Sequence, residues 1–188
     1  KKLPPEVQAI ISASDAGYHA TTVELVNAFL ENNPDSLRGW LDLGHSLAQL
    51  ARYDGAESAY QKAVTLAADG DKSGIYGELG NLFRSKGAYD SAADWYKKQI
   101  DAAPGDAAGF LFLGNLELKR GNCAAAIKAL ELAAECDQYY VEEVHYALGC
   151  AYRSQGNFVE AKKHLQIAVN EEPKFEAAQV ALKDVKSA

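Results

Sequence analysis

Histidine and cysteine are the residue types in this sequence that most readily transfer protons, bind metal ions or act as nucleophiles. The chain has four histidines and three cysteines, namely His19, His45, His145, His164, Cys123, Cys136 and Cys150. The cysteines are odd in number and form no CxxC pair, so the sequence indicates neither a disulfide framework nor a zinc site. The histidines are spread along the chain. We therefore expect ordinary packed or surface residues and no metal or cofactor.

Sequence motifs of the common enzyme classes are absent. The chain contains no GxxxxGK[ST], GxGxxG, HExxH or GxSxG segment. Its 26 acidic residues are what solvated helix faces and helix starts use, and no pair of them stands out as a general acid and base. The sequence therefore predicts a protein that is not an enzyme.

Composition limits the classes of protein further. The chain has 188 residues, 48% of them hydrophobic, which is enough for a sizeable core. Its formal net charge of -7 and pI near 5.1 argue against a dedicated nucleic-acid binder. No apolar run approaches the roughly 18 residues of a membrane span, and the start, KKLPPEVQAI, lacks the apolar region of a signal peptide. A cytoplasmic protein is expected, and the absence of Met is consistent with a fragment of a longer one.

The segment from His145 to Pro173 predicts two short helices joined by a turn. Apolar and small residues recur there at three- or four-residue steps on either side of Gly156, and they are Leu148, Gly149, Tyr152, Phe158, Ala161, Leu165 and Ala168. Small residues on facing helices let two backbones approach closely. A hairpin of this kind cannot bury its apolar face alone, so it predicts similar neighbours.

A Leu-Gly pair that recurs along the chain marks those neighbours. Its glycines are Gly44, Gly80, Gly114 and Gly149, at spacings of 36, 34 and 35 residues. A large aromatic residue lies three positions before the Leu of the first three pairs, namely Trp40, Tyr76 and Phe110. In the fourth pair this position is His145, which is the exception. After each glycine come a turn residue, a small residue and a bulky residue: Ala51, Ala56 and Tyr60; Gly87, Ala92 and Tyr96; Gly121, Ala126 and Leu130; Gly156, Ala161 and Leu165. A period near 34 with helix-turn-helix content resembles the tetratricopeptide repeat.

The resemblance implies an all-α fold, a right-handed α-solenoid of about five stacked antiparallel helix hairpins with a C-terminal capping helix. We predict one continuous domain with repeats at residues 37–72, 73–106, 107–141 and 142–174. Residues 1–36 are predicted to form a degenerate first repeat with Gly17 in its turn. Residues 175–188 are predicted to form the capping helix, because no partner helix follows them.

In tetratricopeptide arrays the first helix of each hairpin lines a concave groove. The resemblance assigns peptide-binding positions in this groove to Arg38, His45, Asn81, Arg84, Asn115, Lys119, Tyr146 and Arg153. Further positions fall on Gly74, Gly77, Ala108 and Leu111. Either the two glycines reflect a frayed helix start, or they form a depression where a ligand backbone can come close.

The groove positions carry four cations and one anion, so their charge of +3 is opposite in sign to that of the whole chain. The hypothesis is a protein or peptide partner with acidic groups, because Arg suits carboxylates and Asn suits a peptide backbone. An ordinary solvated groove is the alternative, since Asp42 and Glu78 lower the charge to +1 if they also face inward.

Some family members hold a C-terminal carboxylate with a clamp of Lys, Asn, Asn, Lys and Arg. Asn81 matches one clamp position, but Gly77 stands where its Lys partner is expected, and Leu111 does so beside Asn115. The clamp is therefore not predicted. The predicted function is a protein-protein interaction scaffold that binds a peptide or partner protein in its groove. Self-assembly into a homo-oligomer and a substrate-selecting arm of a larger enzyme are the alternatives.

Overall fold

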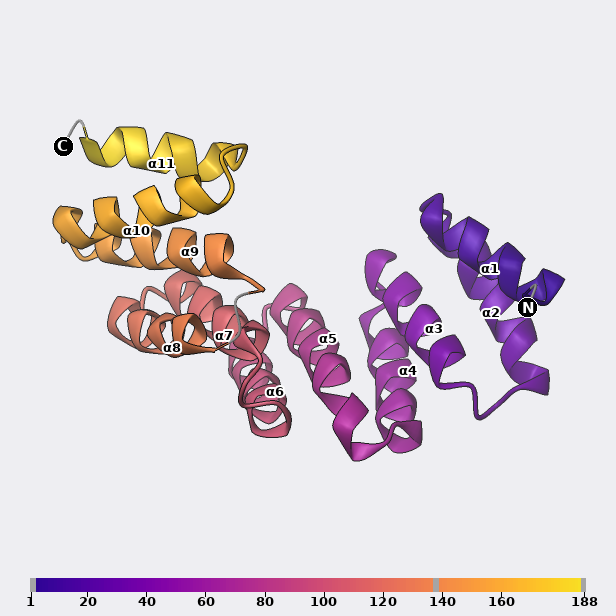
Figure 1. Ribbon diagram of the computed structural model, residues 1–188. Helices are drawn as coiled ribbons and strands as arrows, with labels where there is room; N and C mark the ends of the chain where they lie inside the picture. Colours follow the sequence, from indigo (N-terminus) through magenta and orange to yellow (C-terminus); the bar gives the residue numbers. More distant parts are fainter. Residues whose placement is uncertain (1–2, 137–138, 187–188) are drawn as a thin grey trace. The chain divides into compact units, whose positions relative to one another are not determined.

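Polar residues and glycines divide the chain into helices of 11 to 14 residues. The computed structural model describes residues 3–136 and 139–186, and within them it has eleven α-helices, one 3-10 turn and no strand (Figure 1). The helices of the first half are α1 (Pro5–Asp15), α2 (His19–Asn32), α3 (Leu37–Gln49), α4 (Tyr53–Leu66) and α5 (Lys72–Ser85). Those that follow are α6 (Tyr89–Ala102), α7 (Ala107–Lys119), α8 (Cys123–Glu135), α9 (Val141–Ser154), α10 (Phe158–Glu171) and α11 (Glu176–Lys186).

The turn inside each hairpin contains one residue with a left-handed backbone. The φ angles of Gly17, Gly87, Gly121 and Gly156 are 72°, 76°, 80° and 78°, as expected for the predicted turn glycines. Ala51 adopts the same conformation, with φ of 55°, although it carries a Cβ atom. The left-handed region is unfavourable for such a residue, so the α3–α4 turn is strained relative to the others.

The chain forms two units, residues 1–92 and 93–188. In the first unit, helices adjacent in sequence pack together from α1 to α5 (Figure 1). Its core consists of Ile10, Val23, Val26, Leu30, Leu43 and Ala59. The weakly conforming segment 1–36 therefore contributes a packed hairpin, α1–α2, whose side chains share a core with α3 and α4.

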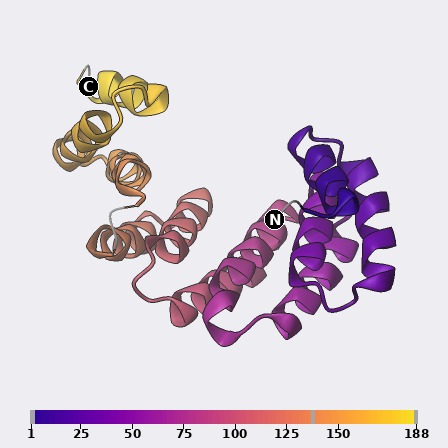
Figure 2. The ribbon, with the colours of Figure 1, turned by 45° about the vertical axis from the view of Figure 1, so that its right-hand side comes forward.

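In the second unit, α7 packs on α8, α8 on α9, and α10 on both α9 and α11 (Figure 2). One core cluster joins α7, α8 and α9 through Leu111, Leu130 and Leu148, among others. Another joins α10 to α11 through Leu165 and Leu182. The last helix is thus held on the apolar face that α10 would otherwise expose, which is the role predicted for a cap.

Close helix packing rests on pairs of a repeated glycine and a large residue sixteen positions later. A Cβ atom at Gly44 would lie 2.7 Å from the ring of Tyr60, one at Gly114 would lie 2.6 Å from Cγ of Leu130, and one at Gly149 would lie 2.5 Å from Cγ of Leu165. Any side chain at these glycines would overlap with its partner. The small residue therefore sets the distance between the two helices of the hairpin.

These features confirm the predicted fold class, an all-α solenoid of helix hairpins with a C-terminal capping helix. Each pair from α1–α2 to α9–α10 falls in one predicted repeat, except that α5 and α9 each begin one residue before theirs, and the repeat boundaries themselves stay a prediction. Among the described residues, no helix is long and apolar enough to cross a membrane.

Candidate functional site

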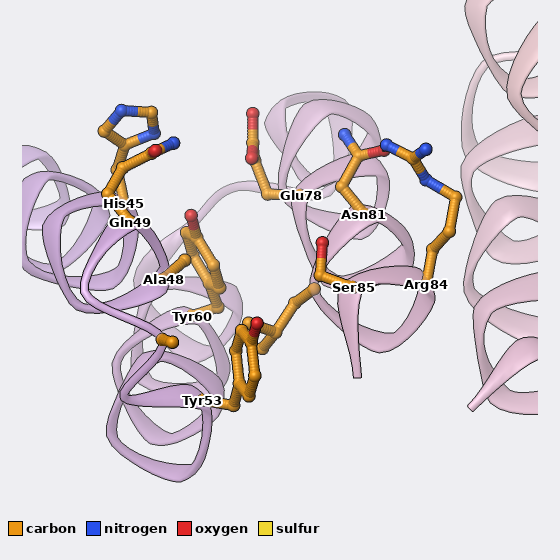
Figure 3. A pocket seen from close by; sticks show the side chains of 11 residues that line it. His45, Ala48, Gln49, Tyr53, Tyr60, Glu78, Asn81, Arg84 and Ser85 are labelled. Carbon is orange, nitrogen blue, oxygen red and sulfur yellow. The ribbon is translucent and has the colours of Figure 1, made fainter. Parts of the chain in front are cut away.

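Two adjoining pockets lie in the first unit, where α3 and α4 face α5. The first, which we call the Arg84 pocket, has a volume of about 340 Å³ and is lined by His45, Ala48, Gln49, Ala51, Tyr53, Tyr60, Glu78, Asn81, Leu82, Arg84 and Ser85 (Figure 3). The second, the Asp71 pocket, has about 350 Å³ and is lined by Arg38, Leu41, Asp42, His45, Tyr60, Asp71, Gly74, Ile75 and Glu78. Three residues are common to both, so the pockets form one groove.

The Arg84 pocket is lined mainly by neutral polar groups. Figure 3 shows Gln49 and His45 on the α3 side, with Asn81 and Arg84 opposite them on α5. The Oδ1 atom of Asn81 accepts a long hydrogen bond of 3.4 Å from Nη2 of Arg84. Two amides and one guanidinium can bond both the donors and the acceptors of a peptide, and a carboxylate.

The Asp71 pocket is negatively charged. Three carboxylates and one guanidinium line it, which gives a net charge of -2. The guanidinium is already paired, because Nε of Arg38 lies 2.8 Å from Oδ1 of Asp42. Asp42 is the more buried partner, with a side chain 13% exposed against 78% for Arg38. Gly74 opens the wall on the α5 side, since a Cβ atom there would meet no atom within 4 Å.

Tyr60 of α4 forms the shared floor of both pockets. Its side chain is 2% exposed and its hydroxyl points toward the cavity (Figure 3). The absence of a side chain at Gly44 makes room for the ring. Burial raises the pKa of the Tyr60 phenol, and the nearby carboxylate of Glu78 raises it further, so the phenol stays a neutral donor.

The predicted site residues of the first unit all line this groove. Arg38 lines the Asp71 pocket, Asn81 and Arg84 line the Arg84 pocket, and His45 lines both. The structure brings these four together in one groove, although their contact with a ligand stays a prediction.

The other four predicted residues lie in the second unit. Asn115 and Lys119 are exposed on α7. The two on α9 contact residues after the last hairpin: the ring of Tyr146 lies 4.9 Å from that of Phe175, and Nη1 of Arg153 lies 3.6 Å from Oδ2 of Asp184 on α11. Tyr146 and Arg153 therefore have a structural task in addition to any role in binding.

Three of the further groove positions are not on the surface. Gly77, Ala108 and Leu111 are buried in the helix packing. A buried residue offers little surface to a ligand, so these three positions do not fit a groove surface that a peptide contacts. Gly74 is exposed and lines a pocket, so of the two glycines only this one fits the predicted depression.

Sequence reasoning missed Asp71, Tyr53 and Tyr60 as groove residues. The sequence predicted Tyr60 as a core residue. Its ring is buried as predicted, but its hydroxyl reaches the groove. Asp71 belongs to the short 3-10 turn Asp69–Asp71 before α5, where no repeat position indicates a role. The one sequence signal for a site here was Gly74. It has no side chain to cover the first turn of α5, and Asp71 directly precedes that turn.

His145 and His164 meet in the second unit. Their Nδ1 atoms are 2.9 Å apart, which joins α9 to α10 by a hydrogen bond. The ring of Tyr152 lies 5.5 Å from that of His164, and the Tyr152 hydroxyl donates to Oε1 of Glu131 at 2.9 Å. Burial lowers the pKa of both imidazoles. His145 is thus a packed residue, as the sequence indicated, with a polar partner.

Comparison with known families agrees with the repeat pattern. Profiles described as tetratricopeptide repeat match residues 12–72, 75–108 and 142–175. Together they cover most of the chain, and the α7–α8 hairpin lies almost wholly outside them. The chain belongs to the tetratricopeptide repeat family.

Individual relatives show the same architecture. The chain is 30% identical over 144 residues to the TPR repeat-containing protein YpiA of Bacillus subtilis (strain 168), a match that covers 70% of this chain and 34% of YpiA. It therefore spans about a third of the length of that relative. The crystal structure of MamA is similar with a TM-score of 0.73 at 20% identity, over 93% of this chain and 98% of MamA.

A second solved structure is of a protein with a bound ligand. The first TPR of Spaghetti (RPAP3), bound to the HSP90 peptide SRMEEVD, matches with a TM-score of 0.60 at 25% identity. The match covers 64% of this chain and 94% of that one. That tetratricopeptide repeat structure is thus seen with a short peptide bound.

Proposed function

We propose that this protein is a non-enzymatic interaction scaffold that binds a peptide segment of a partner protein in the groove between α3, α4 and α5. The observation that carries the proposal is the pair of adjoining pockets in the first unit, whose walls include Arg38, His45, Asn81 and Arg84. Four convergent polar groups in a preformed groove suit a peptide, because less ordering is needed on binding.

The chemistry of the Arg84 pocket supports a peptide ligand. The amides of Gln49 and Asn81 face each other across the pocket and can bond a main chain (Figure 3). Arg84 offers a guanidinium to an acidic side chain or a terminal carboxylate. Arg84 is therefore the residue of this unit to which we assign the acidic partner groups proposed from the sequence, since Arg38 is already paired with Asp42.

The tetratricopeptide neighbour bound to SRMEEVD supports the same class of function. The carboxylate clamp stays outside the proposal, because the position of the expected Lys is Gly77, which is buried. We also propose a cytoplasmic location, which the three free thiols Cys123, Cys136 and Cys150 support.

A selection from a random dodecapeptide display library tests this function, with the 188-residue chain immobilised as bait. Enriched peptides are then synthesised, and their affinities are measured by fluorescence anisotropy. The proposal expects enriched peptides that bind the wild-type chain. A chain that enriches no peptide does not bind peptides in this way.

A pocket-filling variant then locates the binding site. Gly74→Phe directs a ring into the Asp71 pocket from a position where a Cβ atom meets nothing. The matched control is Gly105→Phe, a second open glycine that lies in the other unit. We expect Gly74→Phe to weaken binding by about tenfold or more, and the control to change it by less than about twofold. Equal affinities of the two variants would place the peptide elsewhere.

A further inference from the structure

The groove of the first unit has different charges at its two ends. Asp71, just before α5, lines the Asp71 pocket together with Asp42 of α3, and Glu78, in the middle of α5, lines both pockets. At the end of α5, Arg84 lines the other pocket, beside the neutral groups of Asn81 and Ser85. The net charge of the lining is therefore negative in the Asp71 pocket and neutral in the Arg84 pocket.

Among the described residues that line the Asp71 pocket, one is a cation, and it is already paired. Arg38 is the one basic residue that lines the Asp71 pocket, and it is paired with Asp42. Its side chain is 78% exposed, so the guanidinium is also open to solvent. Asp71 and Glu78 are both exposed residues of the wall. A ligand cation there would meet two carboxylates that lack a basic partner within the pocket lining.

The shape of the Asp71 pocket suits a long basic side chain. Leu41 and Ile75 are its apolar members, and the ring of Tyr60 forms the floor. The aliphatic stem of Lys or Arg packs on such a surface while the charged head reaches the carboxylates. Gly74 leaves the entrance open, and the phenol of Tyr60 interacts with the carboxylate of Glu78.

We propose that the groove selects a peptide with a basic residue seated in the Asp71 pocket and an acidic group seated at Arg84. This inference rests on the proposed function. It adds to it the order of basic and acidic groups along the ligand, which we call the charge order. It also reverses the sign expected from the sequence at one end of the groove, where Asp42 and Glu78 line the wall.

The length of α5 fixes the separation of the two charges. Gly74 and Arg84 are ten positions apart in α5, which at the helical rise is about 15 Å. An extended peptide covers that distance in about four or five residues. The expected ligand thus has Lys or Arg about four or five positions from Asp, Glu or a terminal carboxylate.

The test repeats the display selection with variants that reverse the negative end. The test bait is Asp71→Lys/Glu78→Lys. The control bait is Glu31→Lys/Asp35→Lys, which changes the net charge of the chain equally at two exposed positions outside both pocket linings. A neutral variant, Asp71→Asn/Glu78→Gln, covers the case in which the reversed chain does not fold, as checked by circular dichroism.

We expect wild-type and control baits to enrich peptides with the stated pair of charges. The reversed bait should bind those peptides at least about tenfold more weakly, and the neutral bait should bind them with intermediate affinity. Addition of salt from about 50 mM to about 500 mM should weaken the wild-type complex.

Three outcomes would overturn the charge order. They are enriched peptides without a basic residue, peptides whose affinity for the reversed or neutral bait equals that for wild type, and an equal loss with the control bait. In each case peptide binding itself stands. If the wild-type bait enriches nothing, the proposed function fails, and the charge order fails with it.

Discussion

His145 and His164 share one hydrogen bond between their Nδ1 atoms, at 2.9 Å, although they are nineteen residues apart in the sequence. One ring must donate and the other must accept, so at least one of the two imidazoles is neutral in the α9–α10 hairpin. If both rings were protonated, the acceptor would be lost and two like charges would face each other.

Acid should therefore destabilise this hairpin. Burial lowers the pKa of both imidazoles below the ordinary value, and for His164 the charges of His145 and Lys163 lower it further. Glu131, Glu160 and Glu171 act in the opposite direction, and they do not outweigh the burial. Because these two pKa values are lower in the folded chain than in the unfolded one, the unfolded chain binds more protons once the pH falls below about 6.5. The contribution to stability is therefore fully present above that pH and declines below it.

Urea unfolding midpoints at about pH 7.5 and about pH 5.5 measure this effect. We expect a lower midpoint at the lower pH, and a smaller difference in His145→Gln/His164→Gln. The control, His45→Gln, should keep the difference, because His45 is exposed in the other unit. If the double variant keeps the full pH dependence, other titratable groups cause it.

Gly114→Ala should destabilise the chain by about 1–3 kcal/mol, because the added methyl overlaps with Leu130 and presses on the backbone oxygen of Ala126 at 3.3 Å. Gly74→Ala is the matched control, since its methyl meets no atom within 4 Å. The control should leave the free energy of unfolding unchanged or raise it by up to about 1 kcal/mol. Chemical unfolding monitored by circular dichroism distinguishes the two, and equal effects would contradict the packing role of Gly114.

Ala51→Gly should stabilise the α3–α4 turn. The φ of Ala51 is 55°, a conformation that costs a residue with a Cβ atom about 1–2 kcal/mol and costs glycine almost nothing. The gain in the free energy of unfolding should be about 1 kcal/mol, reduced by the larger entropy of the unfolded glycine chain. Ala48→Gly, inside α3, is the control and should lower stability. A loss in both variants would show that the turn is not strained.

Phe175→Ala should loosen the capping helix. The ring of Phe175 contacts Tyr146 at 4.9 Å between centroids, a contact worth about 0.5–1.5 kcal/mol beyond the area it buries. Amide hydrogen exchange should become faster along α11, with smaller changes in α7 and α8. Val180→Ala, at a position 60% exposed on the same helix, is the control. Unchanged exchange in α11 after loss of the ring would mean that its apolar contacts with α10 are sufficient.

The hairpins could be predicted because the packing of a repeat is local and periodic. Gly114 and Leu130 recur in step with Gly149 and Leu165, and each pair fixes one helix against the next without regard to distant residues. The left-handed turns followed for the same reason, since Gly121 and Gly156 occupy the required positions. The departure at Ala51 was visible in the sequence, although its strain was not.

The sign of charge in the groove was harder to predict. It depends on the orientation and pairing of the side chains in the packed structure, and the position of a residue in the repeat does not predict these. Arg38 counts as a free cation in the sequence but is bound to Asp42 one helical turn away. Glu78 follows a buried glycine, Gly77, and still reaches both pockets. The meeting of His145 with His164 likewise depends on the register of two helices.

The match between each repeated glycine and the residue sixteen positions later also affects how the chain can evolve. Because Gly149 and Leu165 fill one shared space, a larger residue at the first is tolerated only if the second becomes smaller. The same holds for Gly44 with Tyr60. Descendants of this protein should therefore show correlated substitutions at that interval. Substitutions of the residues that face the groove are not coupled to a packing partner in this way, so these residues can change as binding partners change.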